Sequence, residues 1–209
     1  MIFKTNIDFI LSLIKKFLPE VLVEVGFDPN VKEPGHSYGE KVEEKLAEKL
    51  VEIDSRFALP IKNKGKGRQT RKMQDITFLG NFINIKFGFD KKGQPNMVSF
   101  NRLCDKFLSG EIDAYYIISI DGKDNKVYIF NLYEHLNHTN TNLGTGQTML
   151  KEKKFFEYFD QEKDYTITRK DVILKLKEIS KKSHQSHIDL REQQEKKRQE
   201  KFDAKLQLL

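Results

Sequence analysis

The sequence predicts a mixed α/β fold in which a central mixed β-sheet is flanked by helices and followed by a long C-terminal helix. Three observations support this. Segments with apolar residues at helical spacing alternate with short segments rich in β-branched and aromatic residues. Two of the short segments adjoin across the turn signal Gly80-Asn81, and the last 29 residues are dominated by charge. At 209 residues the chain is expected to form a single domain.

Two amphipathic helices are predicted near the start of the chain. Residues 6–18 place apolar side chains on one face, and Pro19 directly after them indicates the end of the helix. Ser37 and Glu40 have the spacing of a capping box, which predicts a second helix running to about Asp54. Glu43 lies off the apolar stripe of this second helix, where an acid ordinarily serves solvation and the helix dipole.

Two further helices are predicted later in the chain. The first covers Met97–Leu108 and ends at Ser109-Gly110. The second opens at Thr168, which forms a capping box with Asp171, and from residue 181 it carries eight Lys or Arg and five Asp or Glu. We expect a solvated helix over about 168–209 that projects from the core, with a dimer contact or a DNA-backbone contact as alternatives.

Short strands are predicted between these helices from their β-branched and aromatic composition. They cover Phe57–Ile61, two arms within Asp75–Lys86, Ala114–Ile120 and Lys126–Leu132.

The hairpin within Asp75–Lys86 contains the candidate site. If Gly80-Asn81 forms the turn, one face of the hairpin is polar, because the register pairs Leu79 with Phe82, Thr77 with Asn84 and Asp75 with Lys86. The other face carries only apolar residues: Ile76, Phe78, Ile83 and Ile85. The Asp75/Lys86 pair has two interpretations, an ordinary cross-strand ion pair or part of a catalytic site.

Two polar loops are candidates for contact with nucleic acid. The segment 62–72 holds six basic residues and two glycines without an acid, which fits a phosphate-contacting arm that includes Lys64, Lys66, Arg68 and Arg71. The segment around Asn142, Gln147 and Thr148 has donors and acceptors of the kind that read base edges, although ordinary surface loops share this composition.

Composition narrows the class of protein. The net charge of +6 and the sequence pI near 9.1 favour an anionic partner such as nucleic acid. One cysteine excludes an intramolecular disulfide framework and fits a reducing compartment. No apolar run approaches the length of a membrane span and no signal peptide is recognised, so we expect a soluble, cytoplasmic protein without a membrane partner.

An acid and a lysine on one face of a sheet suit phosphodiester hydrolysis. The reaction develops negative charge on the phosphate, and a carboxylate-held Mg²⁺ with a nearby Lys can stabilise that charge. Because Mg²⁺ keeps several waters, one or two protein carboxylates are sufficient.

These residues also resemble a known family. Asp75 followed by Asn84-Ile85-Lys86, on the second and third strands of a helix, three-strand, helix, strand core, is similar to the signature of the PD-(D/E)XK nucleases. The segment Gly35–Glu40 with Glu43, the Pro95-Asn96 pair and the Gly146–Met149 stretch resemble type II restriction endonucleases of the EcoRV, HincII and SwaI group. The resemblance covers about residues 35–150.

The resemblance implies a restriction-endonuclease-like core and assigns roles. Asp75 would be the main Mg²⁺ ligand, the Ile85 carbonyl a second ligand and Lys86 the catalytic lysine. Glu43, or less favourably Glu40, would be the opening-helix acid. The segments from Gln94 to Asn96 and from Asn142 to Thr148 would approach DNA.

The sequence departs from the family at Asn84, where Asp or Glu is usual. An amide oxygen can bind Mg²⁺ but adds no negative charge, so Asn84 would be a weaker metal ligand in the catalytic site. The expected function is a Mg²⁺-dependent, site-specific double-stranded DNA endonuclease that leaves 5′-phosphate ends. The alternatives are a catalytically impaired DNA-binding relative and a repair or junction-resolving nuclease.

The resemblance also implies partners. A palindromic duplex presents two equivalent bonds to a two-fold symmetric protein, so a homodimer on double-stranded DNA is expected. A restriction-modification system further implies a cognate DNA methyltransferase in the same cell.

Overall fold

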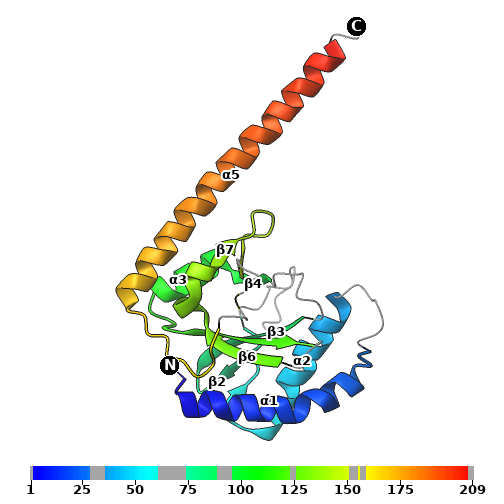
Figure 1. Ribbon diagram of the computed structural model, residues 1–209, viewed down its shortest axis with the longest axis vertical. Helices are drawn as coiled ribbons and strands as arrows, with labels where there is room; N and C mark the ends of the chain where they lie inside the picture. The colour runs from blue at the N-terminus through cyan, green and yellow to red at the C-terminus, as the bar shows by residue number, and fades with distance from the viewer. Residues whose placement is uncertain are drawn as a thin grey trace.

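The computed structural model describes residues 2–28, 36–60, 74–88, 96–122, 126–150, 155 and 159–206. Figure 1 shows a body built on a β-sheet, with one long helix running away from it. The predicted mixed α/β class, with a central mixed sheet, flanking helices and a long C-terminal helix, is confirmed.

The main sheet has five strands in the order β1-β2-β3-β5-β6. Its strands are β1 Phe57–Ala58, β2 Ile76–Phe78, β3 Asn81–Gly88, β5 Tyr115–Asp121 and β6 Lys126–Asn131. All neighbours are antiparallel except β3 and β5, which are parallel and therefore need a crossover connection. Both faces of the sheet are covered, and β5 is buried along almost its whole length.

The β2–β3 hairpin exists, but its predicted register is wrong. Phe78 pairs with Asn81 and Ile76 with Ile83, so the turn residues are Leu79 and Gly80. Both have positive φ angles, 47° and 78°, as a type I′ turn requires. The pairing slides by two residues and Asp75 does not face Lys86. Because side chains alternate with period two, this slide leaves Ile76, Phe78, Ile83 and Ile85 on one buried face.

Two helices cover this apolar face. They are α1 Lys4–Glu24 and α2 His36–Ile53, and their buried residues form one core with Ile83, Ile85 and Ile118. Pro19 lies inside α1, contrary to the prediction that the helix ends there. Leu18 and Val21 are buried on either side of it, so packing outweighs the roughly 3 kcal/mol that an interior proline costs. Helix α2 begins at His36, one residue before the predicted cap.

The other face of the sheet carries a second core. It is formed by α3 Phe100–Leu108, the 3₁₀ helix η1 Leu132–His138 and a small sheet of β4 Asn96–Ser99, β8 Gln147–Leu150 and β7 Thr139–Thr141. The start of the predicted helix Met97–Leu108 is therefore a strand. Phe100 donates its N–H to the Gly146 carbonyl at 3.0 Å where the strand ends. Helix α3 lies between the parallel strands β3 and β5 in the chain and supplies their crossover.

One side chain covers part of the β6 edge of the main sheet. Gln161 acts like a strand residue toward Ile129 of β6, because its Oε1 accepts the Ile129 N–H at 2.9 Å and its Nε2 donates to the Ile129 carbonyl at 2.8 Å. An exposed edge strand is a template for pairing with other chains, and this amide occupies part of it.

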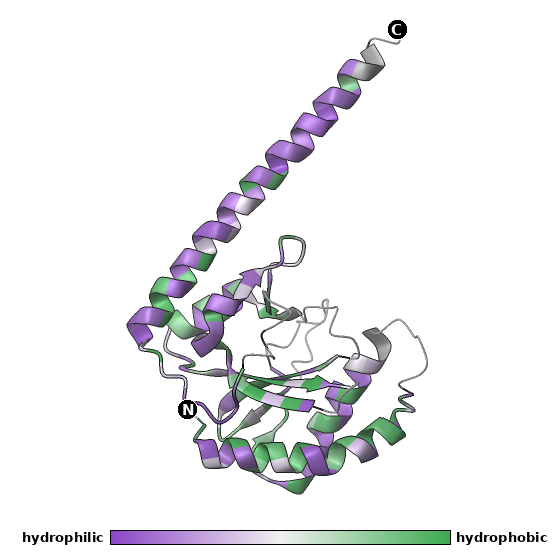
Figure 2. Cartoon of the chain, in the orientation of Figure 1, coloured by the Kyte–Doolittle hydropathy of each residue, from purple (hydrophilic) through white to green (hydrophobic). Residues whose placement is uncertain are grey.

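The last helix, α5 Arg169–Leu206, leaves the body after its first turns. Thr168 caps it as predicted, since the Thr168 hydroxyl accepts the Asp171 N–H at 3.2 Å. Val172 and Leu176 are buried against the second core, whereas Figure 2 shows an almost continuously hydrophilic surface farther out. Among the described residues, no helix combines the length and apolarity needed to cross a membrane.

We predict that Gly122→Ala lowers the free energy of unfolding by about 1–3 kcal/mol. A Cβ at Gly122 would lie 2.4 Å from Cζ of Phe87, whose ring is held by the ring of Phe27 at 5.3 Å between centroids. Urea unfolding measures the change. In the control Gly144→Ala the nearest atom is 3.4 Å away, so its effect is expected within about 0.5 kcal/mol. Equal effects of the two substitutions would contradict the prediction.

Candidate active site

The candidate site lies on the edge of β3 beyond the end of β2. Strand β2 has three residues and pairs only with residues 81–83 of β3, whereas β3 continues to Gly88. Beyond the end of β2, the Ile85 and Phe87 N–H groups on this edge need other acceptors. Both groups donate to carboxylates. Asp75 Oδ2 accepts from Ile85 at 2.7 Å, and Glu43 Oε1 accepts from Phe87 at 3.1 Å.

Asp75 is fixed to β3 through both its backbone and its side chain. Its N–H donates to the Ile83 carbonyl at 2.9 Å, while its carboxylate binds the next outward N–H, that of Ile85. The residue stands just before β2, where the buried Ile76 begins the strand. The hairpin therefore sets the position of the carboxylate, although not through the predicted pairing with Lys86.

Glu43 comes to the same edge from the first turns of α2. Its neighbour Val42 is fully buried and orients the helix on the sheet. Glu43 Oε2 accepts from Lys86 Nζ at 2.9 Å, and both side chains are largely buried, with 17% and 18% of their surface exposed. The structure thus replaces the predicted Asp75/Lys86 pair with a Glu43/Lys86 pair.

The surroundings of Glu43 shift the pKa of its carboxyl in both directions. Burial raises the pKa of its carboxyl above the usual value, and the charge of Asp75 raises this pKa further. The Lys86 ammonium and the Phe87 N–H lower it. Two acids that raise each other's cost of ionisation favour a cation between them, because an added positive charge stabilises both carboxylates.

A third oxygen points to this edge. In a strand the N–H and carbonyl of one residue face the same side, so the Ile85 carbonyl shares the edge on which its N–H meets Asp75. Two carboxylates and one carbonyl form an all-oxygen donor set of the type that suits Mg²⁺. The described residues contain no group of three or more His, Cys, Asp or Glu placed to hold a metal ion. A metal here would keep several waters.

Asn84 has a different environment from the two acids. It is 4% exposed, and its Nδ2 donates to the Met97 carbonyl at 3.3 Å and to the Tyr115 hydroxyl at 3.1 Å. Burial raises the pKa of Tyr115, which keeps its hydroxyl protonated. These bonds tie β3 to β4 and β5 within the second core. They support a structural role for Asn84 better than the predicted ligand role, and Glu43 supplies the second carboxylate.

The predicted DNA-contacting residues fall into three groups. Lys64, Lys66, Arg68, Arg71 and Gln94 lie outside the described residues, as does the side chain of Asn96. Asn142 begins the β7–β8 loop, and its Oδ1 accepts the N–H groups of Gly144 and Thr145 at 2.9 and 3.2 Å. Gln147 is partly exposed at the start of β8. Thr148 is fully buried, which argues against direct contact with a duplex.

The sequence did not indicate the partners of Asn84. It also did not indicate that Glu43 binds both the Phe87 N–H and Lys86 Nζ. The Tyr115 hydroxyl and the Met97 carbonyl approach Asn84 from segments 31 and 13 residues away, and no local pattern indicates such a contact. The short length of β2, which has three residues, was also not apparent from the sequence. The signal available for Glu43 was its place beside the buried stripe of α2.

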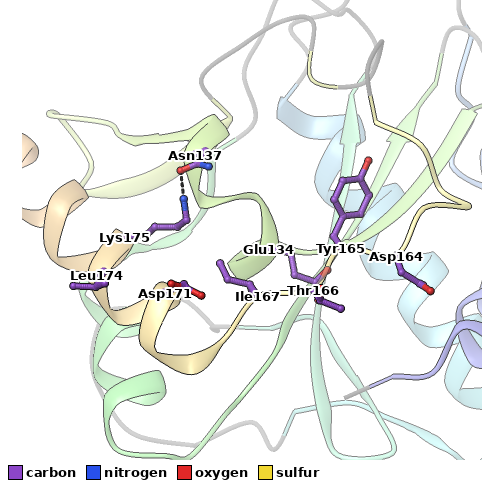
Figure 3. Close-up of a pocket in the computed structure, with 9 residues that line it drawn as sticks. All are labelled: Glu134, Asn137, Asp164, Tyr165, Thr166, Ile167, Asp171, Leu174 and Lys175. Atoms are coloured by element: carbon purple, nitrogen blue, oxygen red, sulfur yellow. Dashed lines mark hydrogen bonds between the residues drawn. The ribbon is translucent and has the colours of Figure 1, made fainter.

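A separate cavity of about 610 Å³ lies between η1, residues 164–167 and the start of α5 (Figure 3). Its lining contains none of the residues of the carboxylate edge. It is polar, with Glu134, Asp164, Asp171 and Lys175 among its residues, and Lys175 is hydrogen-bonded to Asn137.

Comparison of the sequence with protein-family models finds no match, and comparison with curated proteins finds none either. The function is therefore argued from the geometry and chemistry of the carboxylate edge.

We predict that Mg²⁺ raises the thermal unfolding midpoint of the protein through Asp75 and Glu43. At a Mg²⁺ concentration ten times the Kd, binding stabilises the folded state by about 1.4 kcal/mol, equivalent to a rise of about 3–6 °C. Asp75→Asn and Glu43→Gln should lose most of this rise in thermal-shift measurements. Glu44→Gln is the matched control, because Glu44 is exposed on the same helix. An undiminished rise in Asp75→Asn would contradict the metal assignment.

A second prediction concerns Glu134, whose pKa is raised from 4.5 to about 7, mainly by burial. A carboxyl with a raised folded-state pKa stabilises the fold below its ordinary pKa and loses that contribution as the pH rises toward 7. Urea unfolding at pH 5 and pH 7.5 should therefore show a smaller loss of stability with rising pH in Glu134→Gln than in the wild type. The exposed Glu192→Gln should retain the wild-type pH dependence.

Proposed function

We propose that this protein is a Mg²⁺-dependent endonuclease that cuts double-stranded DNA at specific sites and leaves 5′-phosphate ends, in the manner of type II restriction enzymes. The observation that carries the proposal is the carboxylate edge of β3, where Asp75 and Glu43 bind successive outward N–H groups beside the Ile85 carbonyl, with Lys86 paired to Glu43. An all-oxygen donor set beside an ammonium group suits a phosphodiester substrate.

The order of the core supports the same class. Apart from β4, which belongs to the small sheet, helix α2, the antiparallel strands β1, β2 and β3, helix α3 and the parallel strand β5 follow one another in the order implied by the resemblance to PD-(D/E)XK nucleases. Asp75 precedes the second strand of this unit and Lys86 lies on the third, next to Ile85, whose N–H binds the Asp75 carboxylate. The net charge of +6 favours an anionic substrate.

The residues of the carboxylate edge would have different roles in the reaction. Asp75, Glu43 and the Ile85 carbonyl would hold Mg²⁺, which when bound supplies a Lewis acid for the phosphate. Lys86 places a positive charge at the same edge, where it can stabilise negative charge developing on the phosphate oxygens. The bonds from Ile85 and Phe87 fix both carboxylates before substrate arrives, and such preorganisation lowers the reorganisation required during reaction.

Asn84 motivates the main alternative, a DNA-binding relative with impaired catalysis. Its buried amide brings no charge to the edge, so the site has two carboxylates. A repair or junction-resolving nuclease on the same core is the other alternative. As a restriction enzyme the protein would act as a homodimer on a palindromic site, in a cell that contains a cognate DNA methyltransferase.

We predict that the protein converts plasmid DNA to discrete fragments with Mg²⁺ and gives no products with a chelator. Asp75→Asn and Lys86→Met should reduce the cleavage rate at least about 100-fold, because the first removes a carboxylate that would hold Mg²⁺ and the second removes the positive charge that would stabilise the reacting phosphate. Glu44→Gln should cleave like the wild type. Urea unfolding of each variant separates loss of chemistry from loss of folding.

Other outcomes of the same experiment would replace the proposal. Cleavage confined to branched or damaged DNA would indicate the repair or junction-resolving alternative. DNA binding without Mg²⁺-dependent products would indicate the impaired relative. Equal cleavage by the wild type and Asp75→Asn would show that the β3 edge is not the active site.

A further inference from the structure

The outer part of α5 has an unusual distribution of charge. Beyond residue 180 the helix makes no buried apolar contact among the described residues, and positions 188–203 are all exposed. Figure 1 shows this part running free of the body. A helix that is polar all round either bridges to a partner or depends on its own side-chain pairs. Three such pairs lie in this part, Gln185–Asp189, Arg198–Glu195 and Gln199–Glu195.

One side of the outer helix carries basic residues without acidic ones. At about 100° per residue, Arg191, Lys197, Arg198 and Lys201 fall within a sector of about 120°, which also holds His187 and which His184 extends slightly. The acidic residues of the outer part fall within a separate sector of about 140°. They are Asp189, Glu192, Glu195, Glu200 and Asp203. The basic sector contains no acid. The acidic sector is nearly neutral, because Lys181, Lys182 and Lys196 also point that way.

The basic sector has a defined direction relative to the body. Val172 and Leu176 are buried against the second core, so their side chains mark the side of α5 that faces the body. The same calculation of about 100° per residue places Leu176 at the centre of the basic sector. The core-packing stripe of the first turns therefore continues outward as a cationic face. Charges placed only for solubility have no reason to gather on this side.

We infer that this cationic face, defined by Arg191, Lys197, Arg198 and Lys201, binds the phosphate backbone of double-stranded DNA outside the cleavage site. The inference rests on the proposed function for the nature of the polyanion. From Arg191 to Lys201 the helix advances about 15 Å, enough to follow several phosphates along one strand. Contacts of this kind are independent of sequence and position the protein on the duplex.

A second copy of the chain is the competing partner. A stable helix pair buries apolar side chains at heptad spacing. In the outer helix the exposed Ile188 and Phe202 lie two heptads apart, but the heptad position between them is Glu195, and Leu190 lies on another side of the helix. The segregation of charge thus favours a polyanion over a helical partner.

The test compares two full-length double variants that remove the same charge. Arg191→Gln with Arg198→Gln alters the cationic face, and Lys182→Gln with Lys196→Gln alters the acidic sector. Binding to a 30-base-pair duplex is measured by fluorescence anisotropy without divalent ions between 50 and 200 mM salt. Circular dichroism checks that both variants keep their helix content.

Loss of two phosphate contacts should weaken binding several-fold and reduce the slope of log K against log salt by about 1.8. The matched control should keep the wild-type slope. Equal slopes for the two variants would overturn the inference, and so would a change of oligomeric state in light scattering with DNA binding unchanged.

The result is separable from the proposed function. Plasmid cleavage with equal slopes would leave the endonuclease standing and remove the role of α5. A reduced slope in a protein that does not cleave DNA would support the role of α5 and overturn the endonuclease proposal. Absence of any DNA binding by the wild type would overturn both.

Discussion

The structure of the candidate site depends on the difference in length between β2 and β3. Where a strand outlasts its neighbour, its outward N–H groups still require acceptors, because an unsatisfied buried amide costs about 1–3 kcal/mol. Asp75 and Glu43 meet that requirement at Ile85 and Phe87. The same two carboxylates are the groups to which the proposal assigns Mg²⁺. The contacts that satisfy these two backbone N–H groups therefore also place the two carboxylates on the same edge of β3.

This arrangement links the site to both helical layers. Glu43 comes from α2, whose buried residues belong to the first core, whereas Asn84 on β3 is bonded to the Met97 carbonyl and the Tyr115 hydroxyl in the second core. Strand β3 is held from both faces, so its edge has little freedom to shift. A rigid edge suits catalysis because charges held in place need not reorganise. The Lys86 ammonium, which forms a largely buried ion pair with Glu43, is the positive charge that the substrate would meet.

In the β2–β3 hairpin, the predicted faces of the strands depended less on the exact register than the predicted residue pairs did. The predicted turn at Gly80-Asn81 and the observed turn at Leu79-Gly80 differ by a slide of two residues in the pairing. Side chains alternate with period two, so the division into an apolar and a polar face remained correct while the named pairs did not. Turn chemistry alone did not decide between adjacent dipeptides. In the structure Ile76, Phe78 and Ile83 are buried in the first core.

Periodicity and composition were enough to predict the fold class, the capped start of α5 and the β2–β3 hairpin with Asp75 and Lys86 on it, whereas the family resemblance was needed to place Glu43 at the candidate site. These properties depend on neighbours in sequence, where propensity and amphipathic spacing act directly. Tertiary structure alone decided that Lys86 pairs with Glu43, that Asn84 is tied to Tyr115, that Pro19 lies within a helix and that the cationic face of α5 is on the side of the body. Each of these depends on contacts between segments distant in sequence, or on packing strong enough to outweigh a local preference, and neither is recorded in local sequence patterns.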